Sequence, residues 1–233
     1  MRKFLSLFAA VLVALVANAA VINITNANAD ALRLALNSAQ TGDIIEMAAG
    51  TYVESNSDYI AFAGKEVTVR AAEGAEVLIQ PKVSVTLSEG AKARFENIKF
   101  DVSHLIELAS WYEHLIYPTD ATENRLELEG CEFYGFNLNK SMIYCSSSNK
   151  LAAITVNNCY FHDCMKSLIF VESTADMNAQ IKNSTFANIS TNTESYWAGV
   201  IDIRAIGATL LVDHCTFYNV IPMNTDYSSV SKV

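Results

Sequence analysis

The sequence predicts an all-β protein, a parallel β-helix of about seven rungs with a short N-terminal capping helix. The main evidence is a six-residue segment that occurs five times and ends in phenylalanine each time. These segments are residues 95–100, 128–133, 156–161, 181–186 and 212–217. The terminal phenylalanines are 33, 28, 25 and 31 residues apart, which is the length of one supersecondary unit. Because such a unit is too small to bury its own apolar face, the units must stack on one another.

Apolar and polar residues alternate within each segment, as they do in a β-strand. The chain bends in the middle of the segment, at residue types that tolerate left-handed backbone geometry. The bend residues are Asn97, Gly130, Asn158, Asn183 and His214. We expect three inward columns: Phe95, Leu128, Val156, Ile181 and Val212; Ile98, Cys131, Cys159, Ser184 and Cys215; and the five terminal phenylalanines.

Five cysteines are present, which is an odd number. They are Cys131, Cys145, Cys159, Cys164 and Cys215. Three of them share a repeat position with an isoleucine, and such a position is most simply an interior one. We therefore expect buried thiols. A disulfide framework is the alternative for an exported protein.

A second strand is expected after each repeated segment, at residues 104–108, 141–145, 167–171, 199–203 and 229–233. Two earlier rungs are expected at 44–46 and 67–69. Before them, residues 30–39 place apolar side chains at helical spacing, with Asn28 as the expected N-cap. This helix would cover the open end of the first rung, which otherwise presents bare strand edges to water.

The first 19 residues have the features of a secretory signal peptide, with Arg2 and Lys3 before an apolar stretch and an Ala-Asn-Ala cleavage site. We expect a secreted or periplasmic protein, no lipid anchor and one domain over residues 20–233. The apolar stretch is shorter than the roughly 20 residues of a membrane span. Without the two basic residues, 14 basic and 25 acidic side chains remain, a net charge of −11. Such a charge disfavours nucleic acid as a partner.

The segment from Ala31 to Tyr52, ALRLALNSAQTGDIIEMAAGTY, resembles the entry to right-handed β-helices of the pectate-lyase-like superfamily. Chondroitinase-B-like polysaccharide lyases and many uncharacterised exported bacterial β-helix proteins begin in a similar way. The resemblance implies a right-handed helix. In the lyases it also implies a Ca²⁺ ion held by acidic or amide side chains, with Lys or Arg as the base. No catalytic motif of those enzymes matches this sequence, so the catalytic residues stay unknown.

The outward column of the second strand is the strongest candidate for a binding site, because aromatic faces stack on sugar rings and carboxylates bond to hydroxyls. Its residues are Glu107, Tyr144, Phe170, Asp202 and Lys232. The alternative is that neighbouring loops cover the two aromatic rings. The insertion at residues 110–125, which includes His114 and Tyr117, is long enough to do so.

Other candidates are weaker. Glu96 and Glu129 are expected at equivalent positions in adjacent turns. This placement suggests either a cation site or a solvated ladder of charges. Two carboxylate ligands are too few for a Ca²⁺ site. The residues with acid or base chemistry, which no second motif positions, are His162, Asp163, Lys166, Asp202 and Arg204.

These observations favour an exported β-helix that binds a polysaccharide or serves as a surface scaffold, with no metal or cofactor. The alternative is a calcium-assisted polysaccharide lyase or a glycoside hydrolase of the same architecture. The final strand at 229–233 has no capping segment after it in this sequence. A protein partner or self-association is therefore expected at that rung.

Overall fold

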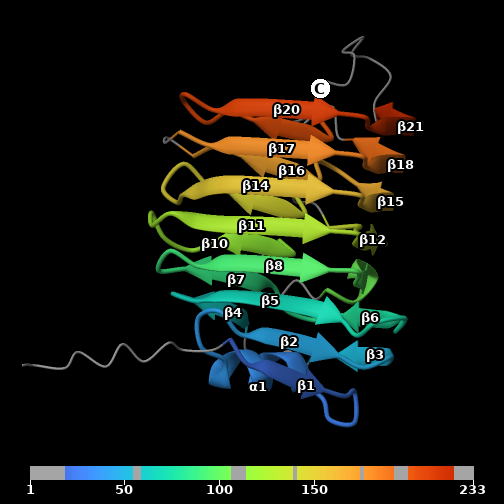
Figure 1. Cartoon of the computed structure of the whole chain (residues 1–233). Helices are drawn as coiled ribbons and strands as arrows, with labels where there is room; N and C mark the ends of the chain where they lie inside the picture. The colour runs from blue at the N-terminus through green and yellow to red at the C-terminus, as the bar shows by residue number, and fades with distance from the viewer. Residues whose placement is uncertain are drawn as a thin grey trace, which may run out of the picture.

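The computed structural model describes residues 19–54, 59–105, 114–138, 141–173, 176–191 and 199–222. In these ranges the chain winds as a parallel β-helix with three strands in a complete turn (Figure 1). All strand pairs between turns are parallel, and each joins a strand to its equivalent in the next turn. The fold class predicted from the repeats is confirmed.

Sheet A takes the first strand of each turn and forms the front face in Figure 1. Its strands are β1 (Val21–Ile24), β2 (Ile44–Met47), β5 (Glu66–Ala71), β8 (Lys92–Glu96), β11 (Asn124–Glu129), β14 (Leu151–Asn157), β17 (Asn178–Lys182) and β20 (Thr209–Asp213). The sequence did not lead us to expect β1. It lies before the helix and pairs with β2.

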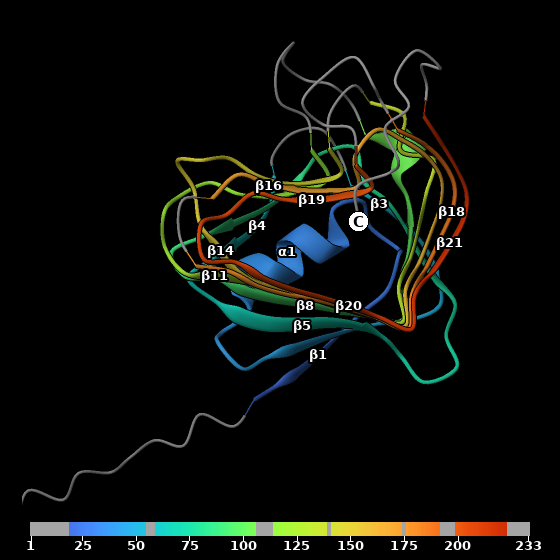
Figure 2. The same ribbon diagram turned by 90° about the horizontal axis from the view of Figure 1, so that it is seen from above.

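Sheet B follows sheet A directly after a tight bend. Its strands are β3 (Gly50–Val53), β6 (Val77–Gln80), β9 (Lys99–Asp101), β12 (Glu132–Tyr134), β15 (Tyr160–Met165), β18 (Thr185–Thr191) and β21 (Thr216–Pro222). Sheet C closes the turn with β4 (Ile60–Ala63), β7 (Val85–Ser88), β10 (Ile116–Pro118), β13 (Ile143–Cys145), β16 (Ile169–Val171) and β19 (Ile201–Ile203). Figure 2 shows the three sheets surrounding the interior.

The bend between sheets A and B has the backbone geometry that the sequence predicted. All five bend residues have a positive φ, with values of 56° at Asn97, 61° at Gly130, 52° at Asn158, 50° at Asn183 and 51° at His214. An added Cβ at Gly130 would collide with the side-chain oxygen of Asn97 in the turn below. Glycine at this position therefore relieves both backbone strain and crowding.

The terminal phenylalanines form one continuous stack of nearly parallel rings. Ring centroids are 4.7 Å apart for Phe100 and Phe133, 4.9 Å for Phe133 and Phe161, 5.0 Å for Phe161 and Phe186, and 4.9 Å for Phe186 and Phe217. These distances match the spacing between neighbouring strands, so each ring covers the next. The predicted inward column is confirmed.

All five cysteines are free thiols, and all but the half-buried Cys215 are buried. Burial raises the pKa of Cys145 to about 12 and that of Cys164 to about 11, which keeps both thiols protonated and unreactive. Ser184, which occupies the same repeat position as Cys131, Cys159 and Cys215, is also buried. Its hydroxyl accepts a hydrogen bond from the Cys159 amide and donates one to the carbonyl of Lys182, so both functions of the hydroxyl are satisfied.

Helix α1 (Ala31–Ser38) closes the N-terminal end of the coil, with Leu32 and Leu36 fully buried against the first rungs. The helix was predicted at this place, but Asn28 as its N-cap was wrong. The N-cap is Asp30, whose φ of 61° is left-handed and whose side chain makes no capping hydrogen bond. Glu54, which follows β3, supplies the missing acceptor. Its Oε1 accepts a bond of 3.2 Å from the amide of Leu32.

The second strand of the first repeat lies later in the chain than the sequence suggested. Residues 104–108 were expected beside Ile143, whereas the residue that pairs with Ile143 is Ile116 of β10. A short 3₁₀ helix, η1 (Val102–His104), follows β9 of sheet B, and β10, the strand that pairs with β13 in sheet C, begins at Ile116. Residues 106–113, which include Glu107, lie outside the described residues, as does the expected final strand at 229–233.

None of the helices in the described residues has the length and apolar character needed to cross a membrane. The expected signal peptide, residues 1–19, lies outside the described residues except for its last one, and it stays a prediction.

The phenylalanine stack leads to a first prediction. Replacing Phe161 with alanine should lower the free energy of unfolding by about 3 to 5 kcal/mol, because the ring is fully buried between two others. Urea denaturation followed by circular dichroism measures this. The control is Tyr218→Ala on β21 of the same sheet, where the side chain is 66% exposed and the loss should stay below about 1 kcal/mol. Equal losses in the two variants would contradict the stack as a source of stability.

Glu54 leads to a second prediction, about pH. Its side chain is fully buried and its Oε2 has no hydrogen-bond partner within the described chain. Burial raises the pKa of Glu54 to about 7 from its usual 4.5. The folded state therefore holds a proton that the unfolded state releases, and this stabilisation is present below about pH 4.5 and is lost as the pH rises through 7.

Glu54→Gln removes the titrating group. The melting temperature of the variant, measured relative to wild type, should therefore be higher at about pH 8 than at about pH 5. Glu73→Gln, which removes the same charge from an exposed position, serves as the control. A constant difference between Glu54→Gln and wild type across this pH range would show that Glu54 does not titrate there.

Candidate functional site

Three of the five residues predicted for the binding column lie in one column on the outer face of sheet C. Tyr144 is the register neighbour of Phe170, and Phe170 is the register neighbour of Asp202. The other two, Glu107 and Lys232, are outside the described residues. Tyr117, the middle residue of β10, occupies the place in the sheet that the sequence assigned to Glu107.

The expectation that Phe170 is exposed was wrong. Its side chain is 0% exposed, because the Tyr144 ring lies parallel to it at 5.7 Å and the guanidinium of Arg204 lies 4.7 Å from its ring centre. The same guanidinium donates to both carboxylate oxygens of Asp202. Phe170 therefore supports Tyr144 from the next turn and does not present its own face. The alternative, that neighbouring loops cover both Tyr144 and Phe170, stays a prediction, because the contacts described for Phe170 come from Tyr144 and Arg204.

A pocket with a volume of about 320 Å³ opens beside Tyr144. Its lining residues are His114, Tyr117, Tyr144, Ser146, Ser148 and Asn149. This volume is at the lower end of the range for pockets that hold small molecules. The lining combines aromatic faces with hydroxyl and amide groups, and such a combination suits a ring that has both apolar faces and hydroxyl groups.

His114 holds the Tyr144 ring in place. The two rings stack with centroids 4.3 Å apart, and the imidazole is 2% exposed. Its Nδ1 lies 2.5 Å from the carbonyl oxygen of Ser141, and because a carbonyl only accepts, Nδ1 carries the proton. Tyr117 completes the aromatic group, with its ring 6.0 Å from that of His114 and at a steep angle to it.

Polar groups at the rim of the pocket are fixed by short contacts. The hydroxyl of Tyr144 donates to Glu172 at 3.2 Å, and the side-chain amide of Asn149 donates to the carbonyl of Pro118 at 2.7 Å. The hydroxyl oxygens of Ser146 and Ser148 are 3.0 Å apart. Such fixed donors and acceptors orient a polar ligand at little entropic cost.

Sequence reasoning did not assign His114 and Tyr117 to the site. It placed them in an insertion expected at most to cover the column, whereas β10 places Tyr117 in the column itself. The available signal was the density of aromatic residues in that insertion, which is higher than a solvated loop requires.

The acidic pair on sheet A does not form a metal site. Glu96 and Glu129 are register neighbours as predicted, but each already has a partner. Arg94 Nε lies 2.5 Å from Glu96 Oε1, and the amide of Asn157 donates to both oxygens of Glu129 at 3.0 Å. Within the described ranges, no group of three or more His, Cys, Asp or Glu side chains is placed to hold a metal ion. The described donors therefore do not fit the Ca²⁺ that the lyase resemblance implies.

His162 on sheet B is the centre of a separate cluster. Its Nδ1 lies 2.6 Å from Asp163 and its Nε2 lies 3.0 Å from Glu132, while its ring stacks between those of Tyr134 and Tyr160. The hydrogen bond from His162 lowers the pKa of Asp163. This cluster lies on sheet B, whereas the pocket lies beside strands of sheet C.

Comparison with known proteins identifies the fold of this chain but does not identify an activity. No model of a protein family matches the sequence, and no curated protein matches it. Among solved structures, the chain is similar to the PL6 family alginate lyase AlyGC, with a TM-score of 0.63 and 18% identity over 87% of this chain and 29% of that one. An arginine-to-alanine mutant of AlyGC also matches, with a TM-score of 0.52 and 13% identity over 93% of this chain and 39% of that one.

At these identities the likeness shows the fold alone, a right-handed parallel β-helix like that of the polysaccharide lyases. This confirms the resemblance seen in the segment from Ala31 to Tyr52. The chain spans less than two fifths of either neighbouring structure.

Proposed function

We propose that this protein is an exported β-helix that binds a polysaccharide on the outer face of sheet C. The observation that supports this most directly is the pocket of about 320 Å³ in which Tyr117 and Tyr144 stand beside fixed hydroxyl and amide groups. The apolar face of a pyranose ring stacks on tyrosine, and its hydroxyls exchange hydrogen bonds with the rim.

The arrangement of the column favours an extended ligand over a small one. Equivalent outward positions repeat along the helix axis at about 4.8 Å, so one face offers contacts over several rungs. The two faces of the Tyr144 ring contact His114 and Phe170, so in the proposed complex Tyr144 contributes the edge of its ring. Tyr117 provides the stacking surface, and the carboxylate of Asp202, held by Arg204, bonds to hydroxyls further along the column. The likeness to alginate lyases is consistent with a polysaccharide as the ligand.

A polysaccharide lyase is the second candidate, because the solved structures similar to this chain are named as alginate lyases. Within the described residues, no group of three or more His, Cys, Asp or Glu side chains is placed to hold a metal ion, and we assign no catalytic step to the pocket. Incubation with a panel of uronic-acid polysaccharides tests this candidate, since a lyase generates an unsaturated product that absorbs ultraviolet light. Turnover would favour the lyase, and binding without turnover would favour the binding protein.

The binding proposal gives a third prediction. Tyr144→Ala should weaken binding to the glycan selected from an immobilised panel by about tenfold, which corresponds to roughly 1.4 kcal/mol. Tyr144→Phe, which keeps the ring, should retain most of the affinity. The panel is screened with and without Ca²⁺, and affinity is measured by isothermal titration calorimetry after circular dichroism has confirmed that each variant is folded.

Tyr218→Ala is the matched control, because it removes an exposed tyrosine from sheet B. It should leave the affinity unchanged. If the Tyr144 and Tyr218 substitutions had equal effects, or if no glycan bound at all, the proposed site would be rejected.

A further inference from the structure

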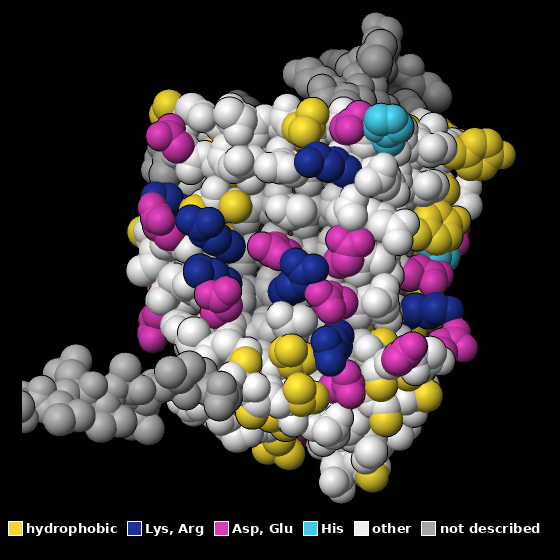
Figure 3. Space-filling model, viewed as in Figure 1, with side chains coloured by type: hydrophobic (Ala, Val, Ile, Leu, Met, Phe, Trp, Pro, Cys, Tyr) yellow, Lys and Arg dark blue, Asp and Glu magenta, His cyan; other side chains and the backbone are white. Residues whose placement is uncertain are grey.

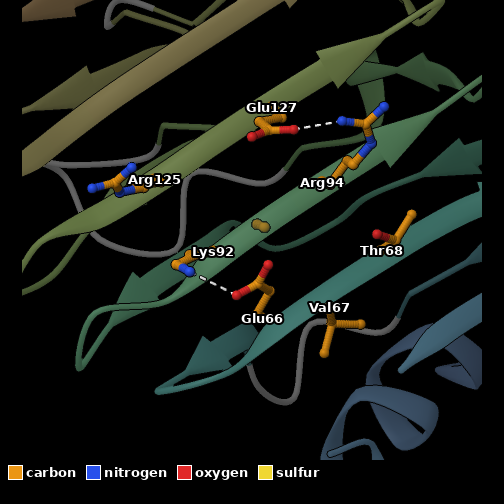
Figure 4. Close-up of a pocket in the computed structure, with 8 residues that line it drawn as sticks. Glu66, Val67, Thr68, Lys92, Arg94, Arg125 and Glu127 are labelled. Carbon is orange, nitrogen blue, oxygen red and sulfur yellow. Dashed lines mark hydrogen bonds and ion pairs between the residues drawn. The ribbon is translucent and has the colours of Figure 1, made fainter. Parts of the chain in front are cut away.

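A second, smaller hollow lies on the outer face of sheet A, across β5, β8 and β11 (Figure 4). Its volume is about 60 Å³, which is enough for a carboxylate or sulfate group but not for a sugar ring. Charged side chains line it: Glu66, Lys92, Arg94, Arg125 and Glu127. We refer to it as the sheet A hollow.

Two of its three cations have acidic partners. Lys92 Nζ lies 2.7 Å from Glu66, and Arg94 Nη1 lies 2.5 Å from Glu127, as the dashed lines in Figure 4 show. Arg94 also contacts Glu96. Most charges on this face are interleaved in the same way, with acidic side chains beside basic ones (Figure 3).

Arg125 is different. Across the described part of the chain, no carboxylate lies within ion-pair distance of its guanidinium, although its charge contributes a minor part to the lowered pKa of Glu123, whose main partner is Lys150. The side chain is exposed and borders the hollow. A guanidinium presents its donors as a planar fork that matches the two oxygens of a carboxylate.

The neighbours of Arg125 in its own column increase the local positive charge. In the turn below, its register partner is Lys92, and in the turn above it is Ala153. Like charges directly opposite each other on neighbouring strands are destabilising. The register partners of Arg125 in the two neighbouring turns, Lys92 and Ala153, include no acidic side chain. An anion bound between Lys92 and Arg125 would remove the repulsion between them.

The charges lining the hollow sum to plus one, with three basic and two acidic side chains, on a chain whose net charge is −9. The net negative charge of the protein repels all anions, so an anion is retained only where direct contacts with cations outweigh this repulsion. We propose that the sheet A hollow binds a single oxyanion, a carboxylate or a sulfate group, with Arg125 as the main donor. The site is separate from the sheet C pocket.

Two sources supply this chemistry, a free anion and the acid group of a polysaccharide unit. The proposal is tested with sodium sulfate, sodium acetate and an oligouronate, and a neutral oligosaccharide of the same length serves as the reference ligand. Binding of each is measured by calorimetry at low ionic strength. Stabilisation by sulfate, read as a rise in melting temperature relative to equal ionic strength of chloride, provides a second readout.

Arg125→Gln should weaken the binding of sulfate, and of the oligouronate if that is the source, by about tenfold, and should leave neutral-oligosaccharide binding unchanged. The matched control is Arg70→Gln, which removes the same charge from the same sheet. Arg70 is already paired with Glu46 at 2.7 Å, so its loss should have little effect on anion binding.

Equal weakening by the Arg125 and Arg70 substitutions would overturn the proposal, because it would indicate a general charge effect. Failure of every anion to bind the wild type would overturn it as well. Binding of sulfate but not of the oligouronate would support the site and identify a free anion as its ligand. Because Tyr144→Ala leaves the sheet A hollow intact, sulfate binding that persists in that variant separates this site from the proposed glycan pocket.

Discussion

The structure depends on one constraint, the need of each turn for a neighbouring turn to cover its apolar side chains. Phe186 and Phe217 show this directly, because they hold the same position in successive repeats. Phe186 has a turn on both sides and is 0% exposed, whereas Phe217 belongs to the last described turn and is 36% exposed. Burial is therefore a property of the stack and not of the repeat itself. Helix α1 meets the same need at the opposite end by placing Leu32 and Leu36 over the first rungs.

This constraint explains which parts of the fold the sequence could predict. The inward columns and the left-handed bends repeat with the same residue types, so alignment of the five segments placed them correctly, including the bend at His214, where no Asn or Gly is present. The strand pairing of the first repeat could not be predicted in this way. An insertion of variable length leaves the register of the next strand open, and residues 104–108 matched the apolar pattern as well as β10 did.

For the candidate site, the alignment of its residues in one column could be predicted from the sequence, but the exposure of their side chains could not. The column that joins Tyr144, Phe170 and Asp202 follows from strand register, which a repeat fixes. Exposure does not follow from register, because it depends on side chains that reach across from other positions. Arg204 lies two residues beyond Asp202 and covers Phe170, and His114 reaches Tyr144 from an insertion. Contacts of this kind depend on the directions of individual side chains, which the repeat pattern does not determine.

The outer faces of the three sheets differ in residue type, because side chains that point outward are not constrained by packing between turns. On sheet C the free positions hold aromatic rings, and on sheet A they hold ion pairs between neighbouring turns, such as Lys92 with Glu66 and Arg94 with Glu127. Opposite charges in neighbouring turns stabilise such a ladder, since like charges one turn apart repel each other unless other side chains compensate them, as Arg94 does for Glu96. The step from Lys92 to Arg125 breaks the alternation, and the next position in the column, Ala153, does not restore it. In the proposed complex, an anion in the sheet A hollow lies between these two cations and restores the alternation of charge along the column.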